Sequence, residues 1–333
     1  MKFNKYYKFG FIFLLLIILF PFDNFVTEVN PYSSNLTSTE ILFKSPKNLF
    51  LSIWFVLFGL PNMIFNFKKN HFLGLVFISC LLVSYNDSLQ FIKGIIFVSF
   101  IFYSKYFRFV LDFLNQILLT KFILNILFIP FNFTFPYNGL NENVNKVSRE
   151  TALTKSRNII IQFLLLFLIF ITESRGGLLL FLSLTFFNLI SRKLINRLKY
   201  FILLTSLFCV FFLIDQTVLT SGRNLAWIQS LVKYSEAPIF GSGMIDYLYY
   251  LWNKGIPSVN FHNSYLEIFV RFGLVGGISF LTTIFIFIKN QSNSYFLVIF
   301  ISLLTILPIE SFIVGYSIES IFFWGILTTK SNS

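Results

Sequence analysis

KYFILLTSLFCVFFLIDQTVLTSGR, residues 199–223, carries the chain from an apolar run of membrane length into a long polar loop. On either side of this stretch, apolar runs of similar length recur along the whole chain. A helix needs roughly 17–25 apolar residues to cross a hydrocarbon layer about 30 Å thick. The pattern therefore predicts an all-α protein whose helices cross a membrane.

Composition points to the same class of protein. Hydrophobic residues make up 56% of the chain and charged residues 12%, whereas soluble domains carry roughly twice that fraction of charge. A transmembrane barrel would alternate polar and apolar residues, but the apolar runs here are continuous. We expect a polytopic transmembrane helical bundle of about 10–11 spans, with one large external loop that carries short interfacial helices. The predicted spans cover residues 9–22, 48–67, 71–85, 88–104, 109–131, 158–173, 177–190, 199–215, 264–288, 294–309 and 311–328.

The basic residues predict the orientation. The connection 191–199 contains four Lys or Arg residues and no acid, as cytoplasmic loops do. The turn at Arg175 and the long loop 216–262 then share the external face. Five full spans from a cytoplasmic N-terminus would leave residues 132–157 outside, whereas the span that leads out to Arg175 requires them inside. Either one segment within 71–131 does not cross the membrane, or residues 141–156 hide a re-entrant helix.

Several classes of protein are excluded by what the sequence lacks. The net charge of +12 comes from scattered Lys and Arg clusters, so we expect no nucleic-acid partner. Cys80 and Cys209 each lie within an apolar run and are predicted to pack there. The chain contains no His-Glu-x-x-His, Cys-x-x-Cys, Asp-x-Asp or glycine-rich nucleotide motif, so no metal and no cofactor are expected. The polar inserts are too short for a core of their own, so residues 1–333 are predicted to form a single integral membrane domain.

Arg175 interrupts apolar sequence within Ile171-Thr-Glu-Ser-Arg-Gly-Gly177. An arginine between two membrane helices is costly unless it meets water, an acid or a ligand. Gly176 and the next glycine allow a close turn with exposed backbone N–H groups, which together with a guanidinium suit phosphate oxygens. A snorkelling arginine, or a pair with Glu173, is the alternative.

Arg223 begins a segment in which Leu225, Ile228, Leu231 and Val232 fall on one face of a helix. This pattern predicts an interfacial helix that lies along the membrane, with Trp227 at headgroup depth. An arginine in the first turn gains nothing from the helix dipole, so something anionic is expected nearby. A solvated surface arginine is the alternative.

His262 stands where the long loop ends and the next helix begins. Its unperturbed pKa of about 6.5 suits a general base, although a surface or capping role is the alternative. Asn263 is predicted to cap the helix. Glu267 and Arg271 are spaced to pair as i and i+4, and Glu267 is also placed to orient His262 or to serve as a second choice of base.

The loop also contains Pro238-Ile-Phe-Gly-Ser-Gly243. We interpret this segment as a turn in which Gly241 and Gly243 allow close approach of the backbone to a substrate. The signal is weak by itself, because Gly-Ser-Gly turns are common.

These motifs, in this order, resemble the O-antigen ligase and polymerase superfamily of bacterial envelope enzymes. The resemblance rests on Ser-Arg175-Gly-Gly, Ser-Gly-Arg223-x3-Trp227, Pro238-x2-Gly-x-Gly243, His262-Asn-x-Tyr-Leu266 and Gly273-x2-Gly276. It covers a predicted catalytic core over residues 158–290, which includes the external loop 216–262.

The resemblance implies a glycosyltransferase in the bacterial inner (cytoplasmic) membrane with its active site on the periplasmic side. The donor would be a glycan linked to undecaprenyl diphosphate, and the acceptor a hydroxyl of a growing polysaccharide (polymerase) or of lipid A core (ligase). Membrane lipids would surround the enzyme, and no metal would be needed. Arg175 and Arg223 would bind the diphosphate, and His262 would be the catalytic base.

A flippase for lipid-linked oligosaccharides is the alternative function. Such a transporter should carry ionisable residues deep in several spans and a repeat between its halves. Asp112, Lys121 and Lys93 are the main intramembrane charges of the first half, and no repeat is visible. The sequence therefore favours the enzyme.

Overall fold

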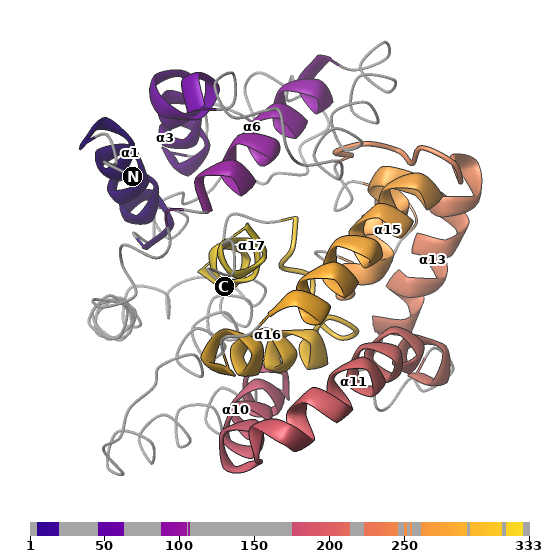
Figure 1. Cartoon of the computed structure of the whole chain (residues 1–333). Coiled ribbons are helices and arrows are strands. Elements are labelled where there is room, and N and C mark those ends of the chain that lie inside the picture. Colours follow the sequence, from indigo (N-terminus) through magenta and orange to yellow (C-terminus); the bar gives the residue numbers. More distant parts are fainter. Residues whose placement is uncertain are drawn as a thin grey trace, which may run out of the picture.

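The fold is described from a computed structural model (Figure 1). The described residues are 5–19, 46–62, 88–104, 106, 175–213, 223–245, 250–251, 254, 261–291, 294–314 and 318–328.

All regular elements in this part of the chain are helices, which confirms the all-α class. They are α1 (Lys5–Leu19), α3 (Pro46–Trp54), the π-helical turn η2 (Phe55–Gly59), α6 (Ser88–Ser104), α10 (Arg175–Leu189), α11 (Arg192–Leu213), α13 (Arg223–Glu236), α15 (Ser264–Asn290), α16 (Ser294–Ile306) and α17 (Ile318–Thr328).

The helices form two groups with α17 between them (Figure 1). Helices α1, α3 and α6 form one group, and α10, α11, α13, α15 and α16 form the other. Helices α10 and α11 pack on α16, α13 packs on α15, and α17 packs on α6. Aromatic side chains join the groups. The ring of Phe97 of α6 stacks on the ring of Phe272 of α15, with 6.2 Å between the ring centroids. It also meets the ring of Trp324 of α17 edge-on, with 6.1 Å between the ring centroids.

Helix α15 is the longest described element, and it is broken at Gly273. Gly273 has φ 64° and ψ −168°, so the helix consists of two segments on either side of this residue. The break frees backbone groups that a continuous helix would pair, and buried groups of this kind need other partners. Residues 238–243 supply them. Ser242 N and Gly243 N donate to Val270 O and Arg271 O, both at 2.8 Å.

The same segment also pairs with the second half of α15. Leu274 N donates to Pro238 O at 2.7 Å, and Val275 N donates to Ile239 O at 3.2 Å. The loop segment thus replaces the hydrogen bonds that the break removes. It fixes the loop against the middle of α15 and holds the first half of that helix in place.

Two predicted boundaries are wrong. The basic residues predicted to lie in the connection 191–199 form the start of α11, because Ser191 O accepts from Leu194 N and Ile195 N and starts the helix there. Lys and Arg are also good helix formers. At the other end of the chain, α16 stops at Ile306 and α17 starts only at Ile318. The residue before Pro308 is disfavoured in a helix, so residues 307–312 form a turn instead of the predicted helical sequence.

The described helices agree in part with the predicted spans. Among the described residues, one helix, Ser264–Asn290, is long and apolar enough to cross a membrane, and six shorter apolar helices accompany it. The predicted segments 71–85, 109–131 and 158–173 lie outside the described residues. The number of spans therefore stays a prediction.

Many large apolar side chains face outward. On α15 they recur along one stripe, where Leu274, Ile278, Phe285 and Ile286 are exposed. Helices α1, α10 and α11 expose similar side chains. Apolar surface of this extent is unusual on a water-soluble monomer and typical of contact with lipid or a partner.

Candidate active site

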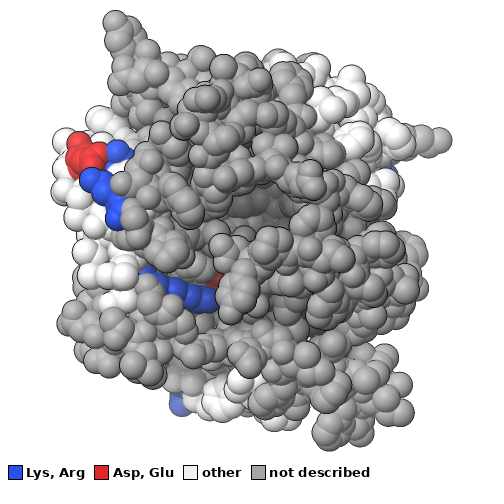
Figure 2. All heavy atoms as spheres, turned by 180° about the vertical axis from the view of Figure 1, so that it is seen from behind, with Lys and Arg blue, Asp and Glu red and all other residues white. Residues whose placement is uncertain are grey.

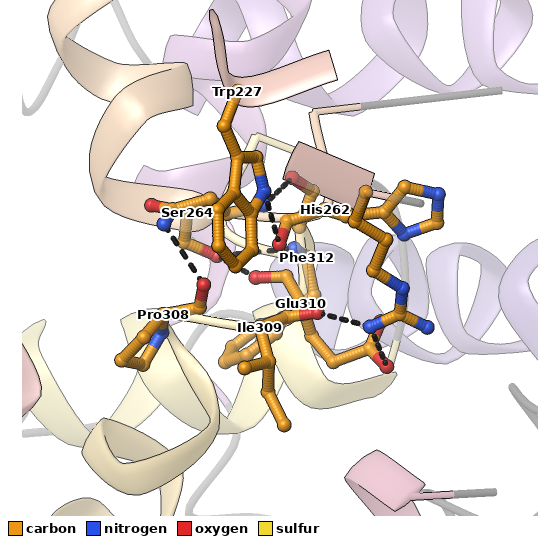
Figure 3. Close-up of polar contacts among 10 residues, drawn as sticks. Trp227, His262, Ser264, Pro308, Ile309, Glu310 and Phe312 are labelled. Atoms are coloured by element: carbon orange, nitrogen blue, oxygen red, sulfur yellow. Dashed lines mark hydrogen bonds and ion pairs between the residues drawn. The ribbon is translucent and has the colours of Figure 1, made fainter. Parts of the chain in front are cut away.

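The candidate site is built around a turn that follows α16. We call residues 307–312 the hub turn. It contains Pro308, Ile309 and Glu310, and the side chain of Glu310 is nearly buried. The N-terminal ends of three helices, α10, α13 and α15, contact this turn, as the following contacts show. Figure 3 shows the turn residues Pro308, Ile309 and Glu310 together with Ser264 of α15.

The start of α15 is the end most firmly fixed to the hub turn. Ser264 N donates to Leu307 O at 2.8 Å, and Ser264 Oγ donates to Glu310 O at 2.6 Å. Asn263 caps the helix as predicted, because its Oδ1 accepts from Leu266 N at 2.9 Å. Its Nδ2 donates to Pro308 O at 2.8 Å, and its backbone N donates to Ser311 Oγ at 2.9 Å. These bonds fix the position of His262, which immediately precedes the cap.

Arg223, the first residue of α13, also reaches the hub turn. Its Nη1 donates to Ile309 O at 2.6 Å and lies 3.5 Å from Glu310 Oε1. The anionic neighbour expected from the sequence is therefore, in this structure, a carboxylate of the protein itself. The side chain of Arg223 is partly exposed, with 24% of its surface accessible, whereas that of Glu310 is 6% accessible.

Helix α10 approaches the hub turn through Gly176. A Cβ atom added there would lie 2.7 Å from Glu310 Oε1, so a larger residue at this position would displace the carboxylate. Gly176 is in the first turn of α10, where N–H groups lack helical partners and the helix dipole is positive. The side chain of Arg175 lies outside the described part of the chain.

His262 sits between α13 and α15 with its backbone in the left-handed region, at φ 48°. Its carbonyl oxygen accepts a hydrogen bond from Trp227 Nε1 at 3.3 Å. Trp227 is completely buried within the protein, and its predicted place at headgroup depth stays a prediction. A buried indole N–H usually has a hydrogen-bond acceptor, and the carbonyl oxygen of His262 is that acceptor for Trp227. In the view of Figure 3, the His262 imidazole and the Glu310 carboxylate lie on the same side of the cluster.

Glu267 and Arg271 form the predicted i,i+4 pair, with Arg271 Nε 3.0 Å from Glu267 Oε1. Arg271 Nη1 also donates to Ile245 O at 3.0 Å, and its guanidinium lies over the ring of Phe261 at 5.2 Å. The pair therefore ties the first half of α15 to the long loop. The suggested role of Glu267 toward His262 or the substrate stays a prediction.

Gly241 and Gly243 allow a close backbone approach, but the backbone that they approach is that of α15. Both have positive φ, at 78° and 73°. A Cβ atom on Gly241 would overlap Arg271 O, and one on Gly273 would overlap Ile239 O. The glycines are explained by the joint between the loop and the break in α15, and their role in substrate binding stays a prediction.

Tyr250, which contacts Lys233 of α13, carries a phenol, another group that can transfer protons. Burial raises its pKa, and the negative charge of Glu236 raises it further. Its phenol therefore stays protonated at neutral pH and cannot act as a base. Lys233 lies over its ring at 5.2 Å.

The described charged side chains lie in small groups. On the face shown in Figure 2, Lys and Arg side chains form separate patches, and one such group lies in a hollow beside an acidic side chain. Within the described ranges, no three His, Cys, Asp or Glu side chains come close enough together to hold a metal ion.

Sequence reasoning missed Glu310 and the hub turn. The predicted spans 294–309 and 311–328 leave Glu310 at their junction. An acid flanked on both sides by membrane-length apolar sequence is expensive and usually functional. That rule, applied to Leu307-Pro-Ile-Glu-Ser-Phe312, would have identified it.

Residues 160–281 match the family model described as O-Antigen ligase. The match begins before α10 and ends within α15, so it spans Gly176, Arg223 and His262 but stops before the hub turn. It confirms the resemblance to the O-antigen ligase and polymerase superfamily. No curated protein and no solved structure matches the chain significantly.

Proposed function

We propose that this chain, which carries an O-antigen ligase domain over residues 160–281, transfers a glycan from a lipid diphosphate carrier to an acceptor hydroxyl. The match to this family supports an enzyme of membrane-associated polysaccharide biosynthesis. The proposal adds the donor, undecaprenyl-diphosphate-linked glycan, and the acceptor, which is a growing polysaccharide or lipid A core.

The observation that carries the proposal is the convergence of three helix N-termini, Arg223 and His262 on the hub turn. The positive ends of helix dipoles and a guanidinium together favour an anion with several oxygens. The N-termini are those of α10, α13 and α15, which are 47 and 40 residues apart in sequence, as counted from Gly176 to Arg223 and from Arg223 to Asn263. Such a gathering of distant segments is what a diphosphate site requires.

The chemistry follows from these groups. In transfer, the acceptor oxygen forms a bond to the anomeric carbon while the bond from that carbon to the diphosphate oxygen breaks. Negative charge develops on the leaving diphosphate, and Arg223, with Arg175 as its proposed partner, stabilises it. The acceptor hydroxyl loses its proton to the imidazole of His262. No other reactant is needed, because the glycan, the proton and the diphosphate are all accounted for.

The architecture supports placing this reaction at a membrane surface. Helix α15 has 27 residues and is broken at Gly273, and its second segment, residues 274–290, corresponds to about 25 Å, close to the thickness of the hydrocarbon layer. The candidate site lies at the first residue of α15. Near its other end, Lys199 from the basic start of α11 donates to Ile288 O at 2.8 Å. The site and the basic start of α11 are therefore at opposite ends of α15, as a cytoplasmic basic region and an external site require.

Helix α13 supports the same placement. Leu225, Ile228, Leu231 and Val232 are exposed along one of its faces, with accessible fractions of 40–51%. A helix with such a face and a polar remainder suits the membrane interface. The polyprenyl tail of the donor would remain among apolar helices while its diphosphate reaches Arg223.

Replacement of Arg223 or His262 tests the proposal in cells. Arg223→Ala and His262→Ala should each abolish long-chain surface polysaccharide, because each removes one of the proposed charge-stabilising or proton-accepting groups. The measurement is the length distribution of the glycan on gels, with membrane content of each variant checked by immunoblot. Lys254→Ala, an exposed change on the same loop, is the control and should leave chains normal. Glycan chains of normal length in both site variants would refute the proposed enzymatic function and leave the flippase as the alternative.

A further inference from the structure

Glu310 is a nearly buried acid in the hub turn, and no step of the transfer described above uses it. Burial of a carboxylate is costly unless positive partners surround it. Two such partners are present: the guanidinium of Arg223, 3.5 Å from Oε1, and the first turn of α10, where a Cβ atom added to Gly176 would lie 2.7 Å from the same oxygen. The position would be easy to fill with an apolar residue if only packing mattered.

The contacts of Arg223 show what the hub turn does to its guanidinium. Nη1 is held by Ile309 O at 2.6 Å and by Glu310 Oε1 at 3.5 Å. Among the residues that the structure describes, neither Nε nor Nη2 has a hydrogen-bond partner. A guanidinium is planar and carries five donors in a fixed fork. Fixing Nη1 therefore orients the remaining donors, which are left for a ligand.

We propose that Glu310 is a positioning residue, which holds one nitrogen of Arg223 so that its other donors face the diphosphate of the donor substrate. The inference rests on the proposed function and adds a residue outside the segment matched by the family model. Glu310 itself carries negative charge, so it would not bind a diphosphate. It acts through Arg223, by limiting the orientations in which that guanidinium can meet the leaving group.

Glu310→Gln tests this role, because glutamine keeps the size and an acceptor oxygen but removes the charge. A loosely held guanidinium misaligns with the leaving diphosphate, so the transfer rate should fall on the order of tenfold to a hundredfold. Affinity for polyprenyl diphosphate, the probe, should be unchanged or higher, since a repelling charge has been removed. A merely structural acid would instead lower the melting temperature, the affinity and the rate together, and that result would overturn the proposal.

A double variant separates action through Arg223 from an independent role. Arg223→Lys retains charge but loses the fork, so it should be slow yet measurable. Glu310→Gln added to Arg223→Lys should slow transfer no further, because the lysine has no fork to position. If the rate reductions of the two single variants multiply in the double variant, the proposal is refuted. Glu236→Gln is the matched control: Glu236 pairs with Lys233 at the exposed end of the same helix, α13, and its loss should leave the rate at wild type.

The test also separates this inference from the proposed function. If the purified wild-type protein transfers glycan and Arg223→Lys is impaired, but Glu310→Gln behaves as wild type, the inference alone is refuted. If the wild-type protein transfers no glycan under conditions in which it binds polyprenyl diphosphate, both the inference and the proposed function are refuted.

Discussion

At the scale of single residues, Asn263 shows how one side chain links the helix to the turn. Its oxygen caps α15 and its amide nitrogen donates to Pro308 O, while the residue is completely buried. Both ends of the amide are therefore engaged within the protein. The sequence predicted the cap from the residue type and its place before an apolar run. It could not predict the second bond, because Pro308 is distant in sequence.

Replacement of Asn263 should therefore affect stability. Asn263→Ala removes the cap, which is worth about 0.5–2 kcal/mol, and removes the donor to Pro308 O. The thermal unfolding midpoint of the protein in detergent should fall. Asn290→Ala, an exposed change at the other end of α15, should leave it within error. An unchanged midpoint in Asn263→Ala would contradict the capping geometry.

The roles of other residues were predictable where they depend on local helix geometry and not where they depend on long-range packing. The pairing of Glu267 with Arg271 was predictable because it depends only on helix geometry. The burial of Trp227 was not, because amphipathic spacing gives the face of a helix but not what covers it. The role of Glu310 depends on long-range packing, because its carboxylate lies beside Gly176 and Arg223.

At the scale of elements, the joint between α15 and residues 238–243 is the feature that shapes the site. The broken helix and the loop exchange four backbone hydrogen bonds, two on each side of Gly273. The sequence predicted a turn at Pro238 and a helix from residue 264, and both are present. It did not predict that the helix breaks and receives the turn, since glycine in a membrane helix is common and usually serves close packing.

Gly273→Ala tests that joint. Alanine at φ 64° and ψ −168° is strained by about 1–3 kcal/mol, and its Cβ would overlap Ile239 O. The loop should separate from the helix, so both the unfolding midpoint and the transfer rate should fall. Leu274→Ala, at an exposed neighbouring position, should change neither by much. A stable and active Gly273→Ala protein would show that the joint is not needed.

At the scale of the whole molecule, the chain places its candidate site and its basic residues at opposite ends of α15. Composition was enough to predict the all-α class, and the order of motifs was enough to predict the superfamily. The spatial convergence on the hub turn was beyond sequence reasoning, because it depends on contacts between residues far apart in sequence, such as Asn263 with Pro308, 45 positions apart, and Arg223 with Ile309, 86 positions apart. Local pattern determines helices, whereas their meeting point depends on long-range packing.

The central claim is that the hub turn and the helix ends around it hold a lipid diphosphate. Its most direct test is an electron cryomicroscopy structure of the purified protein with bound polyprenyl diphosphate. We predict that the diphosphate oxygens lie within hydrogen-bond distance of Arg223 and of the first turn of α10, with the His262 imidazole facing the site of transfer. A diphosphate bound elsewhere, with Arg223 still held only by Ile309 and Glu310, would contradict the claim.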